Sequence, residues 1–297
     1  MKNILVVGAT GNLGPHLVKA FAQNGHHVSA LVRPATMSNT DKVEPLKALG
    51  IRLISGDLND QASLERACEG QDVVVSAVGG EQIMMQPALA EAAVKAGVER
   101  FIPSEFGVDP HTAGKGSCDL FDAKAIAQEQ IKATGIPTTM VYSNGFMEFW
   151  ASGLGQLGPG SPPEQVQLFG DGQTSATMTS LGDIAKYTAA VIEDPSTLNK
   201  EVSISPNKIT QSELIDLWES LSGKSVERIP VSRQEVDAII DQSNTPEAMM
   251  TRIFTQLHRS VWLSGDTDKN RPGVIEAVSK YSAISPVTPR DFLGNFL

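Results

Sequence analysis

The residues with the most informative chemical spacing are three glycines near the start of the chain, Gly8, Gly11 and Gly14. They follow a short apolar run and open a stretch with helical spacing of apolar residues. In that context the first glycine permits a tight turn, the second lets the backbone approach a pyrophosphate, and the third lets the helix pack close to the strand. The free N–H groups at the helix N-terminus then attract phosphate. The motif predicts a dinucleotide site with contacts from Gly8, Thr10, Gly11, Asn12, Leu13 and Gly14.

Arg33 distinguishes between the two nicotinamide cofactors. An NAD site usually carries Asp or Glu at the end of the second strand, where the carboxylate binds the ribose 2′-hydroxyl. Here that strand ends at Val32, and no carboxylate occurs before Asp41. Arg33 can form charge-assisted bonds with a 2′-phosphate, and Lys42 can add a second cation. This substitution favours NADPH over NADH; the alternative is that both side chains are ordinary solvated cations.

The elements that must position these residues alternate between apolar runs and amphipathic segments. Strands that alternate with helices imply right-handed crossovers and a parallel sheet. The sequence therefore predicts an α/β fold of the Rossmann type, with a doubly wound parallel sheet. The predicted strands cover residues 3–7, 28–32, 52–55, 72–78, 101–102 and 138–142, with helices over 13–24, 42–49, 60–68, 87–96 and 120–133.

The sequence changes in character after Trp150. Residues 153–163 are rich in glycine and proline and are typical of a loop. Two apolar runs, 166–169 and 174–178, flank Gly170-Asp171-Gly172, which predicts a hairpin. We expect an NADP-binding domain over residues 1–150 and a smaller α+β substrate domain over 151–297. Within the second part, residues 174–178 and 202–205 are candidates for strands that return to the main sheet.

Composition limits the kinds of partner. The net charge is −10, and the 24 Lys and Arg residues are scattered, which argues against a nucleic-acid surface. Cys68 and Cys118 have neither disulfide nor metal spacing, and no HExxH or carboxylate–histidine cluster is present. No apolar stretch reaches the ~18 residues that a membrane helix needs. We expect a cytoplasmic protein that binds a small molecule, with no metal, no nucleic acid and no membrane partner.

Residues at the carboxyl ends of the predicted strands are candidate contacts, because doubly wound sheets bind ligands beyond those ends. The alternative for each of them is a role in turn geometry or local packing. We expect cofactor contacts from Ser76, Ala77, Val78, Pro103, Ser104, Asn144 and Phe146, and substrate contacts from Phe106 and Met147.

Several longer blocks resemble one known family. The chain is similar to the isoflavone reductase-like, NmrA-like branch of the atypical short-chain dehydrogenases, which includes phenylcoumaran benzylic ether reductases and pinoresinol–lariciresinol reductases. The resemblance covers nearly the whole chain. It rests on Gly8–Gly14, Arg33-Pro34, Arg100–Gly107, Phe121–Ala125, Gly135-Ile136-Pro137, Ser143–Phe146, Asp194–Lys200 and Glu213–Glu219.

The resemblance implies that NADPH is the cofactor and that Lys124 contacts it and acts as the catalytic acid/base. The Tyr-x-x-x-Lys pair of short-chain dehydrogenases is absent, because Leu120 stands four residues before Lys124. A free lysine amine titrates near ~10.4, too high for a good base at neutral pH, so we expect burial to lower its pKa. The alternative is an exposed helix lysine of the kind expected at Lys132.

Three functions compete. The first is an enzyme, an NADPH-dependent reductase of an aromatic or otherwise apolar small molecule such as a phenolic ether, quinone or carbonyl compound. The second is a non-catalytic redox sensor that binds NADP(H) and regulates a partner, as some NmrA-like proteins do; a sensor does not need Lys124. The third, an epimerase or dehydratase, is disfavoured by Leu120. Residues 271–297 follow the family only loosely and the 147–163 loop should face the substrate, so the family's substrate specificity is not carried over.

Overall fold

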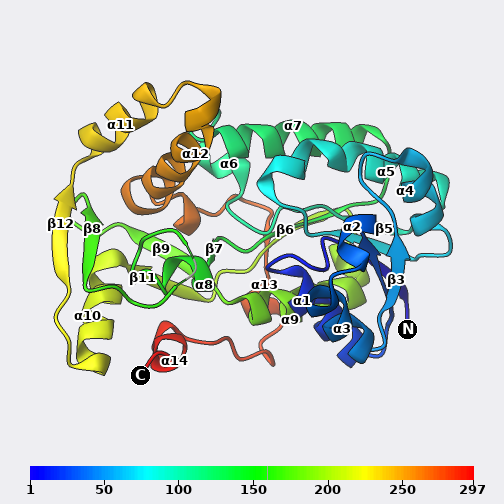
Figure 1. Cartoon of the computed structure of the whole chain (residues 1–297), viewed down its shortest axis with the longest axis horizontal. Coiled ribbons are helices and arrows are strands. Elements are labelled where there is room, and N and C mark those ends of the chain that lie inside the picture. The colour runs from blue at the N-terminus through cyan, green and yellow to red at the C-terminus, as the bar shows by residue number, and fades with distance from the viewer. Residues whose placement is uncertain (159) are drawn as a thin grey trace.

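The computed structural model describes residues 1–158 and 160–297, and its N-terminal part is built around a parallel sheet (Figure 1). Five strands lie in the order β3-β2-β1-β4-β5, all parallel. The order reverses direction between β1 and β4, and this is the place where such sheets leave a crevice for a ligand. The predicted fold class is confirmed. The strands are β1 (Asn3–Val7), β2 (His27–Val32), β3 (Arg52–Ser55), β4 (Val73–Ser76) and β5 (Arg100–Ile102).

The parallel array continues past β5. A bridge between Phe101 and Thr138 brings β6 (Thr139–Tyr142) alongside β5, and β6 pairs in parallel with β10 (Lys200–Ser203). On its other side β10 pairs with β13 (Ile275–Glu276), again in parallel. Two late segments of the chain therefore extend the array that the N-terminal half begins.

Helices cover both faces of the sheet because alternate strand residues point to opposite faces. Along β1, Ile4 and Val6 join the core that includes Leu17 of α1, whereas Leu5 and Val7 join the opposite core. Helices α1 and α9 pack against each other, as do α4 and α5, and α5 and α7. The bounds are α1 (Gly14–Gln23), α2 (Pro34–Met37), α3 (Thr40–Ala48), α4 (Gln61–Cys68), α5 (Gln86–Lys95), α6 (Pro110–Ala113), α7 (Asp119–Ala133) and α9 (Leu181–Glu193).

Most of the remaining elements gather around a third core that contains Trp150, Trp218 and Trp262, whereas α13 packs against α9 in the first core. Here β9 pairs antiparallel with β11 and parallel with β7, while β8 pairs in parallel with β12. Figure 1 shows α10, α11 and α12 beside these strands, away from β3. The bounds are β7 (Gly145–Phe146), β8 (Gln165–Phe169), β9 (Ser175–Thr179), β11 (Asn207–Thr210), β12 (Glu227–Val231), α8 (Met147–Trp150), α10 (Gln211–Ser222), α11 (Arg233–Gln242), α12 (Met249–His258), α13 (Ala277–Lys280) and α14 (Pro289–Gly294).

The predicted hairpin around Gly170-Asp171-Gly172 is wrong. A turn does occur there, with positive φ at Gly170 and Gly172, but the two strands that it joins enter different sheets. Gly170 donates its N–H to Val231 of β12 instead of pairing toward β9. The turn signal is local, whereas the choice of strand partner depends on packing with segments far along the chain.

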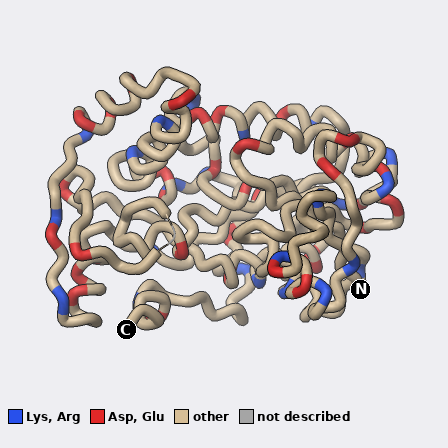
Figure 2. Tube along the Cα trace, viewed as in Figure 1, with Lys and Arg blue, Asp and Glu red and all other residues tan. Residues whose placement is uncertain are grey.

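The other short helical turns cover Gly80–Met85, Pro195–Thr197, Pro246–Ala248, Arg259–Leu263 and Asp266–Asp268. None of the helices within residues 1–158 and 160–297 combines the length and apolar character that crossing a membrane requires. Positive and negative residues are interspersed along the whole trace (Figure 2).

Candidate active site

The glycine loop between β1 and α1 has no room for side chains at two of its positions. Gly8 adopts a φ of +88°, and a Cβ there would lie 2.4 Å from the carbonyl oxygen of Ala77. A Cβ on Gly14 would lie 2.2 Å from the carbonyl oxygen of Gly8. The Gly11 N–H donates to that same oxygen at 3.0 Å, which closes the turn. No side chain caps the start of α1 among the described residues. Pro15 has no N–H and His16 donates to the carbonyl oxygen of Leu13, so the Gly14 N–H is the one in the first turn that remains available to an anion.

An outer cavity of about 440 Å³ lies beside this loop. Arg33 and Lys42 both line it, and both are exposed. Neither side chain forms an ion pair with any residue that the structure describes, so both cations are available to a phosphate. Residues 56–59, which follow β3, line the same cavity and were not predicted. The strand-end rule would have found them, because they stand directly after a strand.

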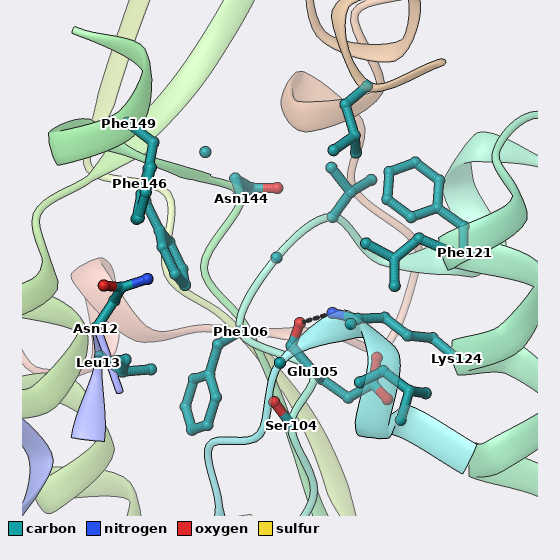
Figure 3. Close-up of a pocket in the computed structure, with 18 of the residues that line it drawn as sticks. Asn12, Leu13, Ser104, Glu105, Phe106, Phe121, Lys124, Asn144, Phe146 and Phe149 are labelled. Atoms are coloured by element: carbon teal, nitrogen blue, oxygen red, sulfur yellow. Dashed lines mark hydrogen bonds between the residues drawn. The ribbon is translucent and has the colours of Figure 1, made fainter. Parts of the chain in front are cut away.

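An inner cavity of about 350 Å³ lies beside the first. The two share Gly11, Ala77, Val78 and Gly79, so the crevice continues from one to the other. In Figure 3, Asn12 and Leu13 stand on one side of the inner cavity and Lys124 on the other. The predicted residues that line the inner cavity are Gly11, Asn12, Leu13, Ala77, Val78, Ser104, Phe106, Lys124, Asn144 and Phe146.

Lys124 belongs to the buried face of α7. The buried residues Phe121, Lys124, Gln128 and Ile131 recur every three or four positions, which is the spacing of one helical face. The Lys124 side chain is 8% exposed, and its Nζ donates a hydrogen bond to the backbone carbonyl oxygen of Glu105. Burial lowers the pKa of Lys124, and the nearby carboxylate of Glu105 opposes that shift in part. The amine is therefore less basic than a lysine in water.

Asn144 holds the turn after β6 in an uncommon backbone conformation. It has a φ of +59°, which non-glycine residues rarely adopt and which is often kept at functional sites. Its N–H donates to the carbonyl oxygen of Gly107 at 3.0 Å, and its side-chain amide donates to Ser205 Oγ at 3.2 Å. These bonds tie the ends of β5, β6 and β10 together beside the cavity.

The wall around the amine is mainly apolar and aromatic, and part of it comes from late in the chain. Phe149 and Trp150 follow Phe146, and Leu157 belongs to the glycine- and proline-rich loop. The sequence predicts that the 147–163 loop faces the substrate but singles out none of these three residues, because no strand end or motif marks them individually. The lining residues that were not predicted include Phe121, Phe149, Trp150, Leu157, Leu257, Val261 and Thr267.

Four predicted contacts lie outside both cavities. Met147, expected to touch substrate, is fully buried in the third core because α8 turns its first residue inward; Phe149 and Trp150 line the cavity instead. Ser76 is fully buried within β4, and Pro103 is also buried. Gly14 is buried where α1 meets the glycine loop, so it serves the close packing of the helix. The structure gives the prediction for Met147 no support, because its side chain lines neither cavity.

Comparison with known proteins agrees with this architecture. The sequence profile of the NmrA-like family matches residues 1–284. Pinoresinol reductase 1 of Arabidopsis thaliana is 40% identical and covers 99% of this chain and 96% of its own length. Phenylcoumaran benzylic ether reductase Betv6 of Betula pendula is 37% identical over 99% of this chain and 98% of its own. The solved structure of AtPrR2 with NADP+ and (+)-pinoresinol superposes with a TM-score of 0.90 at 33% identity, covering 100% of this chain and 99% of that one.

The fold is of the Rossmann type, its cavity lies at the carboxyl ends of the parallel strands, and these matches agree with both. The chain belongs to the NmrA-like family, and its curated relatives include isoflavone reductase homologues and pinoresinol and phenylcoumaran benzylic ether reductases. The family predicted from the sequence blocks is confirmed.

Proposed function

We propose that this protein is an NADPH-dependent reductase that transfers hydride to an uncharged aromatic small molecule. One observation supports the proposal most directly: a buried amine, Lys124, reaches the wall of an aromatic cavity that is continuous with the glycine loop between β1 and α1. The named reductases among its relatives support the same assignment.

The residues present fit NADPH. The cradle at Gly8 and Gly11 and the uncapped start of α1 would hold the pyrophosphate, since side chains at Gly8 and Gly14 would collide with backbone. Arg33 and Lys42 would bind the 2′-phosphate. When bound, the cofactor supplies hydride from its nicotinamide ring.

Lys124 is the proposed acid/base. Its amine would exchange a proton with a phenol or carbonyl oxygen of the substrate, beside the carbon that is reduced. The lowered pKa suits this role, because an acid/base works best when its pKa lies close to the working pH. Leu120 lines the cavity four residues earlier, so no tyrosine assists the lysine from that position.

The lining also favours a substrate class. Phe106, Phe121, Phe146 and Trp150 offer flat apolar surface, and Lys124 is the only Lys, Arg or His among the described lining residues. Phenolic ethers, quinones and aromatic carbonyl compounds fit such a surface better than phosphorylated or carboxylated molecules do. We further propose that residues 1–150 mainly bind cofactor, that 151–297 mainly contribute the substrate wall, and that the protein acts in the cytoplasm.

Replacement of Lys124 tests the function directly. We expect Lys124→Ala to lower kcat by about 100-fold or more with phenolic ethers, quinones or aromatic carbonyls, because it removes the proton-exchanging group. NADPH affinity, titrated by fluorescence, should stay within about twofold, a change worth under ~0.5 kcal/mol. Lys132→Ala is the matched control, since Lys132 lies on the exposed side of the same helix. If the wild type oxidises NADPH with no member of this panel, the protein is a nucleotide-binding sensor instead.

A further inference from the structure

Glu105 is a buried acid for which the proposed reaction has no direct use. Its side chain is fully buried, and neither carboxylate oxygen makes a hydrogen bond of normal geometry with a described residue, although the side chain of Gln128 is near enough to lower its pKa. A buried carboxylate without partners destabilises a fold, and an amide of the same shape costs less. A group of this kind beside a cavity is therefore more readily explained by function than by packing.

The position of Glu105 is fixed by the amine that it faces. Lys124 donates its Nζ hydrogen bond to the backbone carbonyl oxygen of Glu105 itself. The carboxylate of the same residue lies near enough for each charge to act on the other, without the direct contact of an ion pair. Figure 3 shows both residues on the same side of the cavity, opposite Asn12. At that range, in a poorly hydrated interior, two opposite charges interact far more strongly than they do in water.

The other titratable groups near Glu105 are paired, exposed or uncharged. Asp109 is paired with Arg271, with 2.6 Å between its Oδ2 and the arginine Nε. His111 is exposed and contacts Gln128 through Nε2 at 3.0 Å. Tyr142, on β6, is buried, and burial raises the pKa of its hydroxyl, so it stays uncharged. Lys124 is the cation with the largest effect on the carboxylate, and His111 acts on it more weakly.

Lys124 has one other titratable neighbour besides Glu105. Cys118 precedes α7, and burial raises the pKa of its thiol to about 11, so it carries no charge at neutral pH. Glu105 is thus the nearby group whose negative charge acts on the amine. The influence runs both ways, since burial raises the pKa of Glu105 to about 7 and Lys124 lowers it.

We propose that the Glu105 carboxylate is the buried counter-ion of Lys124 and sets the proton affinity of the cavity amine without touching the substrate. Glu105 is therefore a positioning residue. With its charge present, the amine keeps its proton more firmly and can give it to a substrate oxygen. Without that charge, the dry surroundings favour the neutral amine at neutral pH. This inference adds to the proposed role of Lys124. Only its expected effect on kcat/KM rests on that role.

The direct test is an NMR titration of the free protein, which needs neither cofactor nor substrate. The Lys124 Nζ signal in ¹⁵N-lysine-labelled protein is assigned by its loss in Lys124→Met. We expect Glu105→Gln to lower the Lys124 titration midpoint by about one pH unit or more, a tenfold change in the proton dissociation constant. Glu105→Asp retains the charge, so its Lys124 midpoint should lie closer to that of the wild type, by at least half of the difference that Glu105→Gln produces. In kinetics, the limb of the kcat/KM profile that belongs to Lys124 should move by the same amount.

Glu148→Gln is the matched control, because Glu148 is another poorly exposed glutamate whose pKa burial raises, yet it contacts Leu181 and not the cavity amine. It should leave the Lys124 midpoint within about 0.2 pH unit. Coupling between two sites is reciprocal, so Lys124→Met must raise the Glu105 midpoint, read from ¹³C-labelled glutamate, by an equal amount. This second measurement stands even if Glu105→Gln fails to fold.

Three results would overturn the inference. The first is an unchanged Lys124 midpoint in folded Glu105→Gln, and the second is an equal shift of that midpoint in Glu148→Gln. The third is an unchanged Glu105 midpoint in Lys124→Met. Failure of the proposed function looks different: the two midpoints would still be coupled, but no substrate in the panel would be reduced.

Discussion

Trp262 donates a 2.8 Å hydrogen bond from its indole Nε1 to the carbonyl oxygen of Gly155, and both residues are buried. Trp262 also packs edge-on against Trp150, with 6.0 Å between ring centroids. Two residues after Gly155, the Leu157 N–H donates to His258 Nε2 at 3.1 Å. The glycine- and proline-rich loop that carries Leu157 into the cavity wall is therefore anchored at two points.

Trp262→Phe should weaken this anchor. Phenylalanine keeps most of the apolar contact but leaves the buried Gly155 carbonyl unpaired, which costs about 1–3 kcal/mol. Urea denaturation should show a loss of that size at an unchanged m-value. With a reducible aromatic substrate, KM should rise more than kcat falls, since the loop shapes the wall and not the amine. A variant as stable as the wild type would show that the hydrogen bond contributes nothing.

Gly11→Ala separates cofactor binding from folding. A Cβ at Gly11 would lie 3.3 Å from the Gly8 carbonyl oxygen, which is tight but tolerable, whereas it would stand where a pyrophosphate must approach. We expect NADPH affinity to fall about tenfold or more, equivalent to ~1.4 kcal/mol, with a stability change below ~1 kcal/mol. Fluorescence titration and thermal unfolding measure the two effects. Gly182→Ala, in a helix where the added methyl would meet only Ser180 Oγ at 4.0 Å, is the control and should change neither.

Arg33→Ala tests the choice of cofactor. A charge-assisted hydrogen bond contributes about 1.5–3 kcal/mol, so NADPH affinity should fall by roughly 10- to 150-fold. NADH lacks the 2′-phosphate, and its affinity should not change. Arg52→Ala removes an exposed arginine from the start of β3 and should leave both affinities as they are. An equal loss of affinity for NADPH and NADH would mean that Arg33 does not bind the 2′-phosphate.

Glu105 predicts how stability depends on pH. Its pKa rises from an ordinary 4.5 to about 7 in the folded protein, so between these values the folded state binds more protons than the unfolded state. Unfolding free energy must then fall as pH rises through this window, in total by about 3 kcal/mol, and remain low above it. Glu105→Gln lacks this contribution. The difference between the two proteins, from urea denaturation at pH 4.5 to 8, should grow with pH and level off near 7.

The sequence predicted those parts of the molecule whose causes are local. The glycine loop, the alternation of strands and helices, and the strand ends at Ala77, Ser104 and Asn144 depend on nearby residues, and the structure brings them to one crevice. Lys124 could be recognised from its sequence block, and its place in a buried helical face could have been read from the three- and four-residue spacing.

The parts of the fold and of the cavity that the sequence did not predict depend on pairing between distant segments of the chain. The parallel match of β8 with β12 joins segments some sixty residues apart, as in the register of Gln165 with Glu227, and no turn signal encodes it. The cavity contacts of Leu257 and Val261 arise because the third core places them over α7, where Arg252 of α12 pairs with Asp119 at 2.7 Å. Such placement follows from packing, which short patterns do not record.

The late strands β10 and β13 have a consequence for how the protein is made. During synthesis, β6 emerges from the ribosome well before Lys200–Ser203, so for a time one side of it has no strand to pair with. Unpaired strand edges invite association with other chains. A nascent or truncated product that stops near residue 150 should accordingly aggregate or recruit chaperones, and the sheet is complete only when Ile275–Glu276 has been released.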